Sequence, residues 1–351
     1  MPSIVAVGDL MLGDTAAAPG FGFASRLGAR RLAEVFHDVA PLLDGADVVF
    51  GNLEVILSLE GYVPDRLASR HMRGWPRFAL ELKDLGFTVL NVANNHANQH
   101  GTGAFLETCR LVESAGIGVC GIRGTAPWCS KPLVLHAGGE RVGFLGYCLH
   151  PRRYFPDQTP PFAEGSLGEI VSDISRFRPQ VDSLCVSLHW GEEFVPQASE
   201  DEAAWGEAMV AAGATVVLGH HPHVVRRADL RSGRLVALSL GNFASDLVWD
   251  DLMSEGVVLR CGVERGTVTH VELHRTRVNG RYQIRIDPRE SRGLLPLPPL
   301  PKEEYHRQAR RLDGVMRRRR LLHLTRSLVR ADWRLLRQWV TGVVKGRLRG
   351  A

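Results

Sequence analysis

The chain has few cysteines and no long apolar run. Its six cysteines are scattered, and none forms a Cys-x-x-Cys pair, which favours reduced thiols in a cytosolic protein. The chain has no run of 18 apolar residues, the length needed to span a bilayer. The apolar residues 4–7 follow Met1 with no basic leader, so we expect a first strand there and not a secretory signal. The sequence therefore predicts a cytoplasmic protein, peripheral to the membrane if it touches one.

The main part of the chain also lacks an excess of positive charge. Residues 301–351 carry 15 Lys and Arg against 4 Asp and Glu, which leaves 28 against 34 for residues 1–300. The net charge of +5 is therefore the sum of +11 in the tail and −6 in the rest. We do not expect a nucleic-acid partner, because an acidic main domain would oppose one. With 44% apolar residues, the chain is long enough for one large α/β domain or two smaller ones.

Short apolar runs alternate with segments of helical spacing through most of the chain, which is typical of an α/β protein. After residue 255 the pattern changes to antiparallel strands, with a strong hairpin signal at Asn279 and Gly280. The expected strands are 3–7, 47–50, 88–90, 142–147, 183–188, a run from 216, 236–240, 256–263, 267–273 and 282–286. The expected helices are 30–40, 78–85, 104–114 and 202–212.

The most informative stretch is residues 216–223, where a β-branched run ends in Gly-His-His-Pro-His. Neutral imidazole is a common ligand for first-row metals, and Pro222 stiffens the link between His221 and His223. A His-rich surface loop is the alternative interpretation of this segment.

Polar side chains also follow other expected strands, namely Asp9, Glu54, Asn95 with His96, and His189. Strand ends of an alternating chain meet at one sheet edge, so these residues could share one crevice. Carboxylate, amide and imidazole donors suit manganese, iron or zinc, and the set is large enough for one or two ions. Such a site would support metal-assisted hydrolysis. The alternatives are ordinary turns and a solvated Glu54.

Six segments in order resemble the motifs of the CapA family of capsule or poly-γ-glutamate synthesis proteins. They are residues 8–12, 52–54, 94–96, 189–191, 219–223 and 239–243. The resemblance covers about residues 3–250. It implies a calcineurin-like metallophosphoesterase fold, which is a four-layer α/β/β/α sandwich of two mixed sheets.

The resemblance also implies two metal positions that share Glu54, and a proton donor, His96, for the leaving group. The implied ligands are Asp9 and His223 for one ion, and Asn95, His189 and His221 for the other. The side chains expected to contact substrate are Asn52, Asn94, Glu193, His220 and Asn242.

Two residues depart from the pattern of the family and its superfamily. Met11 stands where a histidine ligand is usual, and a thioether is a poor ligand for a hard cation. Gln99 stands where an aspartate commonly supports the histidine of Asn-Asn-His. From the resemblance we still expect a metal-dependent hydrolase of the CapA type, acting in the synthesis, release or export of a capsular or other anionic polymer and cleaving a phosphoester or amide bond. A non-catalytic capsule-assembly protein and a stand-alone phosphoesterase are the alternatives.

The C-terminal region differs in kind from the rest. We expect a main domain over residues 1–292, a Pro-rich linker over 293–302 and a basic amphipathic helical tail over 303–351. A basic helix with tryptophans suits an anionic membrane surface, where it could lie beside a membrane-bound polymer synthase. A helix packed back on the domain, with a solvated arginine face, is the alternative.

Overall fold

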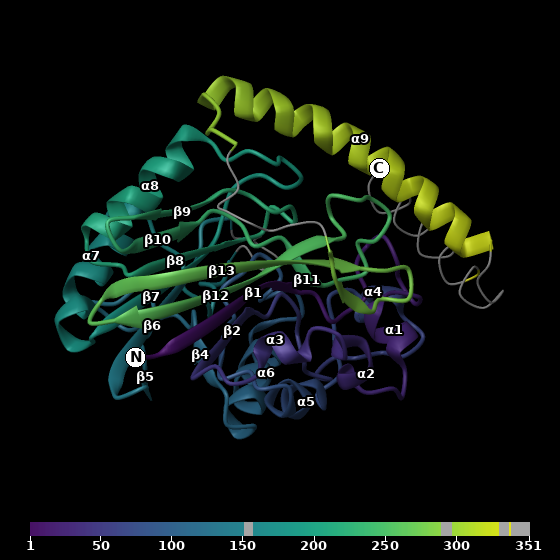
Figure 1. Ribbon diagram of the computed structural model, residues 1–351. Coiled ribbons are helices and arrows are strands. Elements are labelled where there is room, and N and C mark those ends of the chain that lie inside the picture. Colours follow the sequence, from purple (N-terminus) through teal and green to yellow (C-terminus); the bar gives the residue numbers. More distant parts are fainter. Residues whose placement is uncertain (151–156, 289–296, 330–336, 338–351) are drawn as a thin grey trace.

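The computed structural model describes residues 1–150, 157–288, 297–329 and 337. Two mixed sheets pack face to face, with helices on both outer faces (Figure 1). This arrangement confirms the four layers expected from the sequence.

The eight-stranded sheet has the order β14-β13-β12-β1-β2-β3-β4, with β11 paired to β1, and the six-stranded sheet has the order β5-β6-β7-β8-β10-β9. The first sheet contains β1 Ser3–Leu10, β2 Val48–Asn52, β3 Val89–Asn91, β4 Gly118–Cys120, β11 Asn242–Ala244, β12 Glu255–Glu264, β13 Thr267–Val278 and β14 Ile284–Ile286. The second contains β5 Leu133–Ala137, β6 Glu140–Cys148, β7 Ser183–His189, β8 Val216–His220, β9 Ala228–Arg231 and β10 Arg234–Ala237. The helices are α1 Phe23–Leu27, α2 Leu32–Phe36, α3 Ala40–Leu43, α4 Leu67–Arg70, α5 Phe78–Asp84, α6 Thr102–Ser114, α7 Leu167–Phe177, α8 Glu200–Ala211 and α9 Lys302–Val329.

The first strand shows how the sequence builds these layers. Successive side chains of a strand point to opposite faces. Ile4 and Ala6 of β1 therefore join the core between the two sheets, while Val5 and Val7 pack against the helices outside. Both faces of this strand are covered, which explains why its residues are uniformly apolar instead of alternating with polar ones.

The strand expected over residues 236–240 exists but is shifted, since β10 spans Arg234–Ala237 and ends before Leu238. The structure has β10 in the six-stranded sheet and β11 in the other sheet, so the chain passes between the sheets at Gly241. Gly241 has a φ of 67°, and a Cβ on Gly8 would lie 2.1 Å from the Gly241 carbonyl oxygen. These two glycines allow β1 and β11 to pair directly, and Asn242 lies in register with Asp9.

Helix α7 was not expected from the sequence, although its start carries a clear signal. Ser166 accepts a hydrogen bond from the backbone N–H of Glu169, and the Glu169 carboxylate accepts one from the backbone of Ser166. This reciprocal pair is a capping box. The pattern Ser-x-x-Glu could therefore have located the helix.

The C-terminal helix packs back onto the domain and does not project from it (Figure 1). Tyr305 and Met316 are buried, and Leu324 packs against a small cluster formed by Ala18 and Phe21. Part of the expected linker lies outside the described residues, as does the tail beyond 329 except residue 337. Among the helices that the structure describes, none has the length and apolar content to cross a membrane.

Candidate functional site

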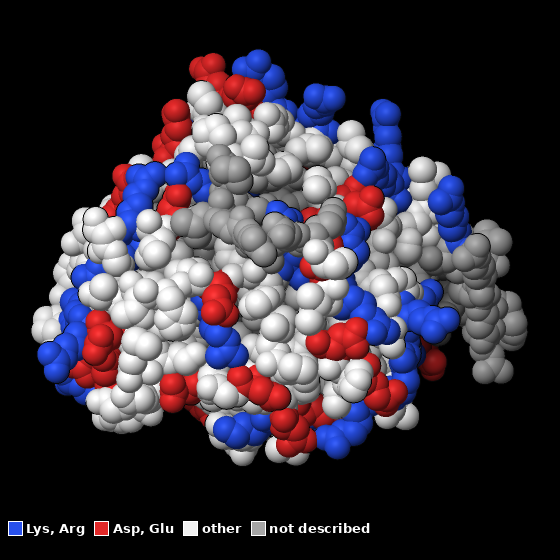
Figure 2. All heavy atoms as spheres, in the orientation of Figure 1, with Lys and Arg blue, Asp and Glu red and all other residues white. Residues whose placement is uncertain are grey.

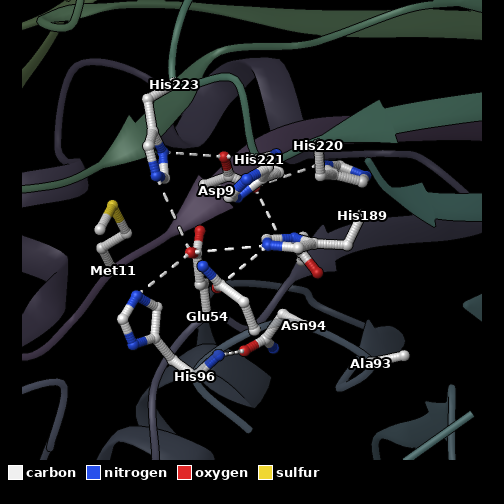
Figure 3. A network of polar contacts seen from close by, with 12 residues as sticks. Asp9, Met11, Glu54, Ala93, Asn94, His96, His189, His220, His221 and His223 are labelled. Atoms are coloured by element: carbon white, nitrogen blue, oxygen red, sulfur yellow. Dashed lines mark hydrogen bonds and ion pairs between the residues drawn. The ribbon is translucent and has the colours of Figure 1, made fainter. Parts of the chain in front are cut away.

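The C-terminal ends of β1, β2, β7 and β8 bring the predicted ligands into one cluster (Figure 3). Glu54, two residues beyond β2, lies at its centre. Its Oε1 atom is 3.8 Å from His189 Nε2, 3.9 Å from His223 Nε2 and 4.0 Å from His96 Nε2. Three imidazoles from three separate parts of the chain therefore face one buried carboxylate oxygen.

Two groups of possible ligand atoms share Glu54. Asp9, Glu54 and His223 form one, and Glu54, His189 and His221 form the other; within each group the atoms lie within 4.8 Å of one another. The amide oxygen of Asn95 adds to the second group, since it is 3.2 Å from His189 Nε2.

The donor set fits a metal ion. Two ligand atoms that are each about 2.1 Å from one ion lie roughly 3 to 4 Å apart. The separations around Glu54 Oε1 match that range and exceed a hydrogen-bond distance. Within the described part of the chain, the Nδ1 atom of His221 is buried without a hydrogen-bond partner. A buried polar atom of this kind costs free energy unless something else satisfies it.

The loop after β8 holds its imidazoles in an unusual backbone conformation. His221 has a φ of 93° and His223 a φ of 57°, in the left-handed region that non-glycine residues rarely adopt. The backbone N–H of His221 donates to Asp9 Oδ2 at 3.2 Å, which ties the loop to β1. Such conformations cost about 1 to 3 kcal/mol each and concentrate at functional sites.

The protonation states favour a cation in the cluster. Burial alone would raise the pKa of Asp9, but His220 and His223 outweigh that effect and hold it well below its usual value. Burial lowers the pKa of His189 and of His221, so both are neutral and able to act as ligands. Burial also opposes charge on His223, yet Glu54 and Asp9 raise its pKa to about 10. The cluster thus stabilises a positive charge between its two carboxylates.

His96 is oriented by the residue that departs from the family pattern. Its Nδ1 atom lies 2.6 Å from Gln99 Oε1, which places Nε2 toward Glu54. The Gln99 amide nitrogen in turn lies 2.7 Å from Nδ1 of His71. Gln99 therefore keeps the orientation of His96 but supplies no negative charge.

The residues expected to contact substrate divide into two groups. Glu193 lines the cavities described below. The amide of Asn52 donates to Asp9 Oδ1 at 2.8 Å, and Asn242 Oδ1 lies 3.0 Å from His223 Nδ1. These two asparagines, together with Asn94 and His220, are almost completely buried behind the ligand side chains. Substrate contact by all five stays a prediction.

Met11 extends an apolar cluster beside the site. It is 3% exposed and packs in a cluster that contains Met72, Leu247 and Met316 of α9. A histidine at this position would add a further nitrogen donor to the Asp9 and His223 side. With Met11, that side depends on Asp9, Glu54 and His223.

Two cavities open from the cluster, of about 220 and 390 Å³. His96 and His223 line the smaller one, and Asn95 and His221 line the larger one. Residues of α9 line both.

Sequence reasoning missed two histidines at this site. His150 stacks on His221 with 5.5 Å between ring centroids, and His71 lies edge-on to His96 at 5.8 Å. His150 follows β6 as the other site residues follow their strands, so its position was a usable signal. His71 has no comparable signal, because it follows the four-residue helix α4.

A buried carboxyl, Asp246, holds the loop that borders the smaller cavity. Its Oδ2 atom accepts hydrogen bonds from the backbone N–H groups of Thr15 at 3.0 Å and Phe23 at 3.3 Å. Burial raises the pKa of Asp246 from 3.8 to about 7, and the neighbouring carboxyl of Asp14 adds to the rise. Burial and the nearby Asp246 raise the pKa of Tyr282 in turn.

The raised pKa predicts a pH-dependent effect of Asp246→Asn. The native state binds the proton more tightly than the unfolded state, so this group's stabilising contribution is complete below pH 3.8 and is lost as pH rises through 7. At about 1.4 kcal/mol for each pKa unit, ionisation costs roughly 4 kcal/mol by pH 8. We expect Asp246→Asn to unfold at higher denaturant concentration than the unmodified protein at pH 8, with an advantage that shrinks toward pH 5. An advantage that does not vary with pH would contradict the assignment.

Comparisons with known proteins agree with the motif pattern. The family described as bacterial capsule synthesis protein PGA_cap matches residues 3–247. The capsule biosynthesis protein CapA of Bacillus anthracis is 30% identical over 223 residues, which are 61% of this chain and 54% of that protein. The PGA biosynthesis protein CapA of Bacillus subtilis (strain 168) is 26% identical over 276 residues, covering 76% of this chain and 70% of that protein.

Among solved structures, the 5′-nucleotidase precursor from Thermus thermophilus has a TM-score of 0.47 and 14% identity, over 78% of this chain and 53% of that one. The chain spans only about half the length of the Bacillus anthracis relative. The family match, in contrast, covers most of the chain and contains the expected ligands Asp9, Glu54, Asn95, His189, His221 and His223. On this evidence, the chain belongs to the bacterial capsule synthesis protein family PGA_cap.

Proposed function

We propose that this protein is a metal-dependent hydrolase that acts in the synthesis, release or export of a capsular or poly-γ-glutamate-type anionic polymer. The observation that carries the proposal is the position of Glu54 between two groups of ligand atoms. The names of the Bacillus relatives support a role in capsule or poly-γ-glutamate synthesis.

In this proposal, Asp9, Glu54 and His223 hold one divalent ion, and Glu54, Asn95, His189 and His221 hold a second. Manganese, iron or zinc would suit these donors. A bound ion would act as a Lewis acid and lower the pKa of the attacking water. The buried amides of Asn52 and Asn242 orient Asp9 and His223 through the hydrogen bonds described above.

His96 is the proposed general acid for the leaving group. Its backbone N–H donates to Asn94 Oδ1 at 3.0 Å, and the Asn94 amide donates to the Leu53 carbonyl at 2.9 Å. Asn94 thus ties His96 to the segment that carries Glu54. With Nδ1 directed at Gln99, the Nε2 atom of His96 faces the cluster and can deliver a proton there.

The purified protein tests this proposal through metal content and turnover. It should contain about stoichiometric manganese, iron or zinc, and it should hydrolyse a chromogenic phosphodiester or a γ-glutamyl amide. His96→Gln should lower kcat by roughly 10²- to 10⁴-fold while the metal content is kept. His136→Gln, a surface histidine on β5, is the matched control and should change neither.

Met11 favours one alternative, a non-catalytic protein that binds polymer at a metal site with fewer ligands. Metal content that is retained without turnover on phosphodiester or γ-glutamyl amide would support that alternative. Turnover of phosphodiesters alone, with no effect on any capsular polymer, would indicate a stand-alone phosphoesterase.

The outer face of α9 supports a second role, contact with an anionic membrane surface from the cytoplasmic side. Leu321 and Leu322 are each 57% exposed, and Arg318 and Arg326 lie within one turn or so of them. Apolar and basic side chains on one exposed helix suit an interface rich in anionic lipid. Such contact would bring the protein close to a membrane-bound polymer synthase.

This role predicts that Leu321→Glu with Leu322→Glu weakens sedimentation with phosphatidylglycerol vesicles by about tenfold or more, since two apolar contacts are lost and two like charges are added. Vesicles of phosphatidylcholine provide the comparison without anionic lipid. Equal sedimentation of both proteins with the anionic vesicles would exclude this face as the contact.

A further inference from the structure

Helix α9 lies across the mouth of the metal cluster and contributes to both cavities. Asp313 lines each of them, and Met316, Arg317 and Arg320 line the smaller one together with His96 and His223. The family match ends at residue 247, so α9, which forms the roof of these two cavities, lies outside the matched region. Residues far from the motifs therefore shape the space where a substrate would lie.

The helix is held in place on both sides of this mouth. The Tyr305 hydroxyl accepts hydrogen bonds from the backbone N–H of Glu192 at 2.7 Å and from Arg226 at 3.2 Å. Farther along, Met316 is buried in the apolar cluster, and Arg319 forms an ion pair with Asp250. The roof is therefore a built part of the fold, and its side chains have defined places above the cluster.

Position distinguishes Arg317 and Arg320 from the other arginines of the helix, because these two line the smaller cavity. Arg317 forms a two-bond ion pair with Asp313, at 3.0 and 2.8 Å, and its side chain is 71% exposed. Such an exposed pair is worth little, so Arg317 can turn to a ligand at small cost. Arg320 makes no hydrogen bond or ion pair that the structure records among the described residues. Figure 2 shows basic side chains spaced along the edge of the molecule where α9 runs.

The cluster below is rich in carboxylates. Asp9 and Glu54 lie at its centre, and Glu193 lines both cavities. These groups would repel an anionic chain, and bound cations would offset that repulsion only close to the ions. Guanidinium groups at the mouth supply the charge and the two-bond geometry that carboxylate and phosphate groups require.

We propose that Arg317 and Arg320 of α9 are specificity-determining residues that bind anionic groups of a polymer next to the bond to be cleaved. This inference rests on the proposed function for the position of that bond. The ligand is a polymer with repeated carboxylate or phosphate groups. Helix α9 would hold this polymer against the cluster of proposed ligand residues.

Binding to the full chain as purified, measured by fluorescence anisotropy, tests the inference without any need for turnover. The probes are labelled poly-γ-glutamate, labelled polyphosphate and labelled dextran as a neutral polymer. We expect R317A/R320A to weaken binding of one or both anionic probes by at least about tenfold, because each charge-assisted contact is worth roughly a factor of ten. The anionic probe that is affected identifies the group.

The matched control, R307A/R310A, removes two charges with the same spacing from the same helix outside the cavities, and it should weaken binding by less than about threefold. R317K/R320K keeps the charge but loses the planar fork, so it should bind with intermediate strength. The inference is overturned if no anionic probe binds, if R317A/R320A binds normally, or if the control loses as much. A protein without hydrolase activity can still bind the probes as predicted. Failure of this inference is therefore distinguishable from failure of the proposed function.

Discussion

Replacing Glu54 with Gln is expected to remove both metal ions at once. The carboxylate is the only residue common to the two ligand groups, and its Oε1 atom is within 4.0 Å of nitrogen atoms of three imidazoles. An amide has the same shape but no charge to balance a cation. Since changes to supporting residues alone typically cost 10- to 100-fold in metal affinity, loss of a shared ligand should cost at least about 100-fold for each ion.

Inductively coupled plasma mass spectrometry of the purified variants measures this effect. Asp9→Asn should affect only the first group, and His189→Ala only the second, so each should keep the ion of the other group. Glu54→Gln should keep neither. Full metal content in Glu54→Gln would show that the ions bind elsewhere. Loss of every ion in all three variants would instead indicate a single site that needs all the donors.

Replacing Glu202 with Ala is expected to destabilise the fold by about 3 to 5 kcal/mol, the cost of removing one partner from a buried ion pair. Its Oε1 atom lies 2.7 Å from Arg226, whose side chain is completely buried. Arg226 also donates to the backbone carbonyls of Val195 and Glu192 at 2.9 Å. Without Glu202, a buried guanidinium would keep its neutral partners and lose the one that balances its charge.

The chain contains a matched control for this prediction. Glu202 and Glu169 are both the third residue of a capping box, with Ser199 and Ser166 as the partners. Glu169 is exposed, and among the described residues it forms no ion pair like that with Arg226. Glu169→Ala therefore removes a cap and should cost about 1 kcal/mol or less. Denaturant unfolding of both variants isolates the contribution of the Arg226 ion pair. Equal destabilisation by the two substitutions would contradict it.

Loss of Glu202 should also loosen the roof over the metal cluster. Arg226 donates to the Tyr305 hydroxyl of α9 at 3.2 Å and to the segment that contains Glu192. The stability of the fold and the position of α9 are therefore coupled through one buried arginine. This connection joins α8, α9 and the segment between β8 and β9, which lie far apart in the sequence.

The clustering of the proposed ligand residues could be predicted because each follows a short apolar run. Strand ends of an alternating chain meet at one edge, so Asp9, Glu54, His189 and His223 could be expected to share a crevice without any knowledge of the distances between them. The coverage of the first sheet on both faces could be expected for a related reason, whereas the four layers were implied by the family resemblance. Runs such as residues 4–7 are apolar on both faces, and only a sheet covered on both sides needs that pattern.

Some features depended on tertiary contacts that no local pattern encodes. Glu54 resembles any other acidic residue after a strand, and only the folded chain places its oxygen between three imidazoles. His71 approaches His96 through Gln99 for the same reason. The passage of the chain between sheets at Gly241 depends on close approach to Gly8, which lies more than 200 residues earlier.

The C-terminal helix shows most clearly which features follow from the local sequence and which depend on tertiary structure. Its helical period and its basic composition follow from the residues themselves, because both are properties of neighbours along the chain. Whether its apolar stripe would face a membrane or the domain depended on the surface available to it. The buried Met316 and the hydrogen bonds of Tyr305 hold one side of the helix against the domain, while Leu321 and Leu322 stay exposed on the other. The position of α9 over the site is set by its burial against residues that are distant in the sequence, and helical periodicity does not reveal those contacts.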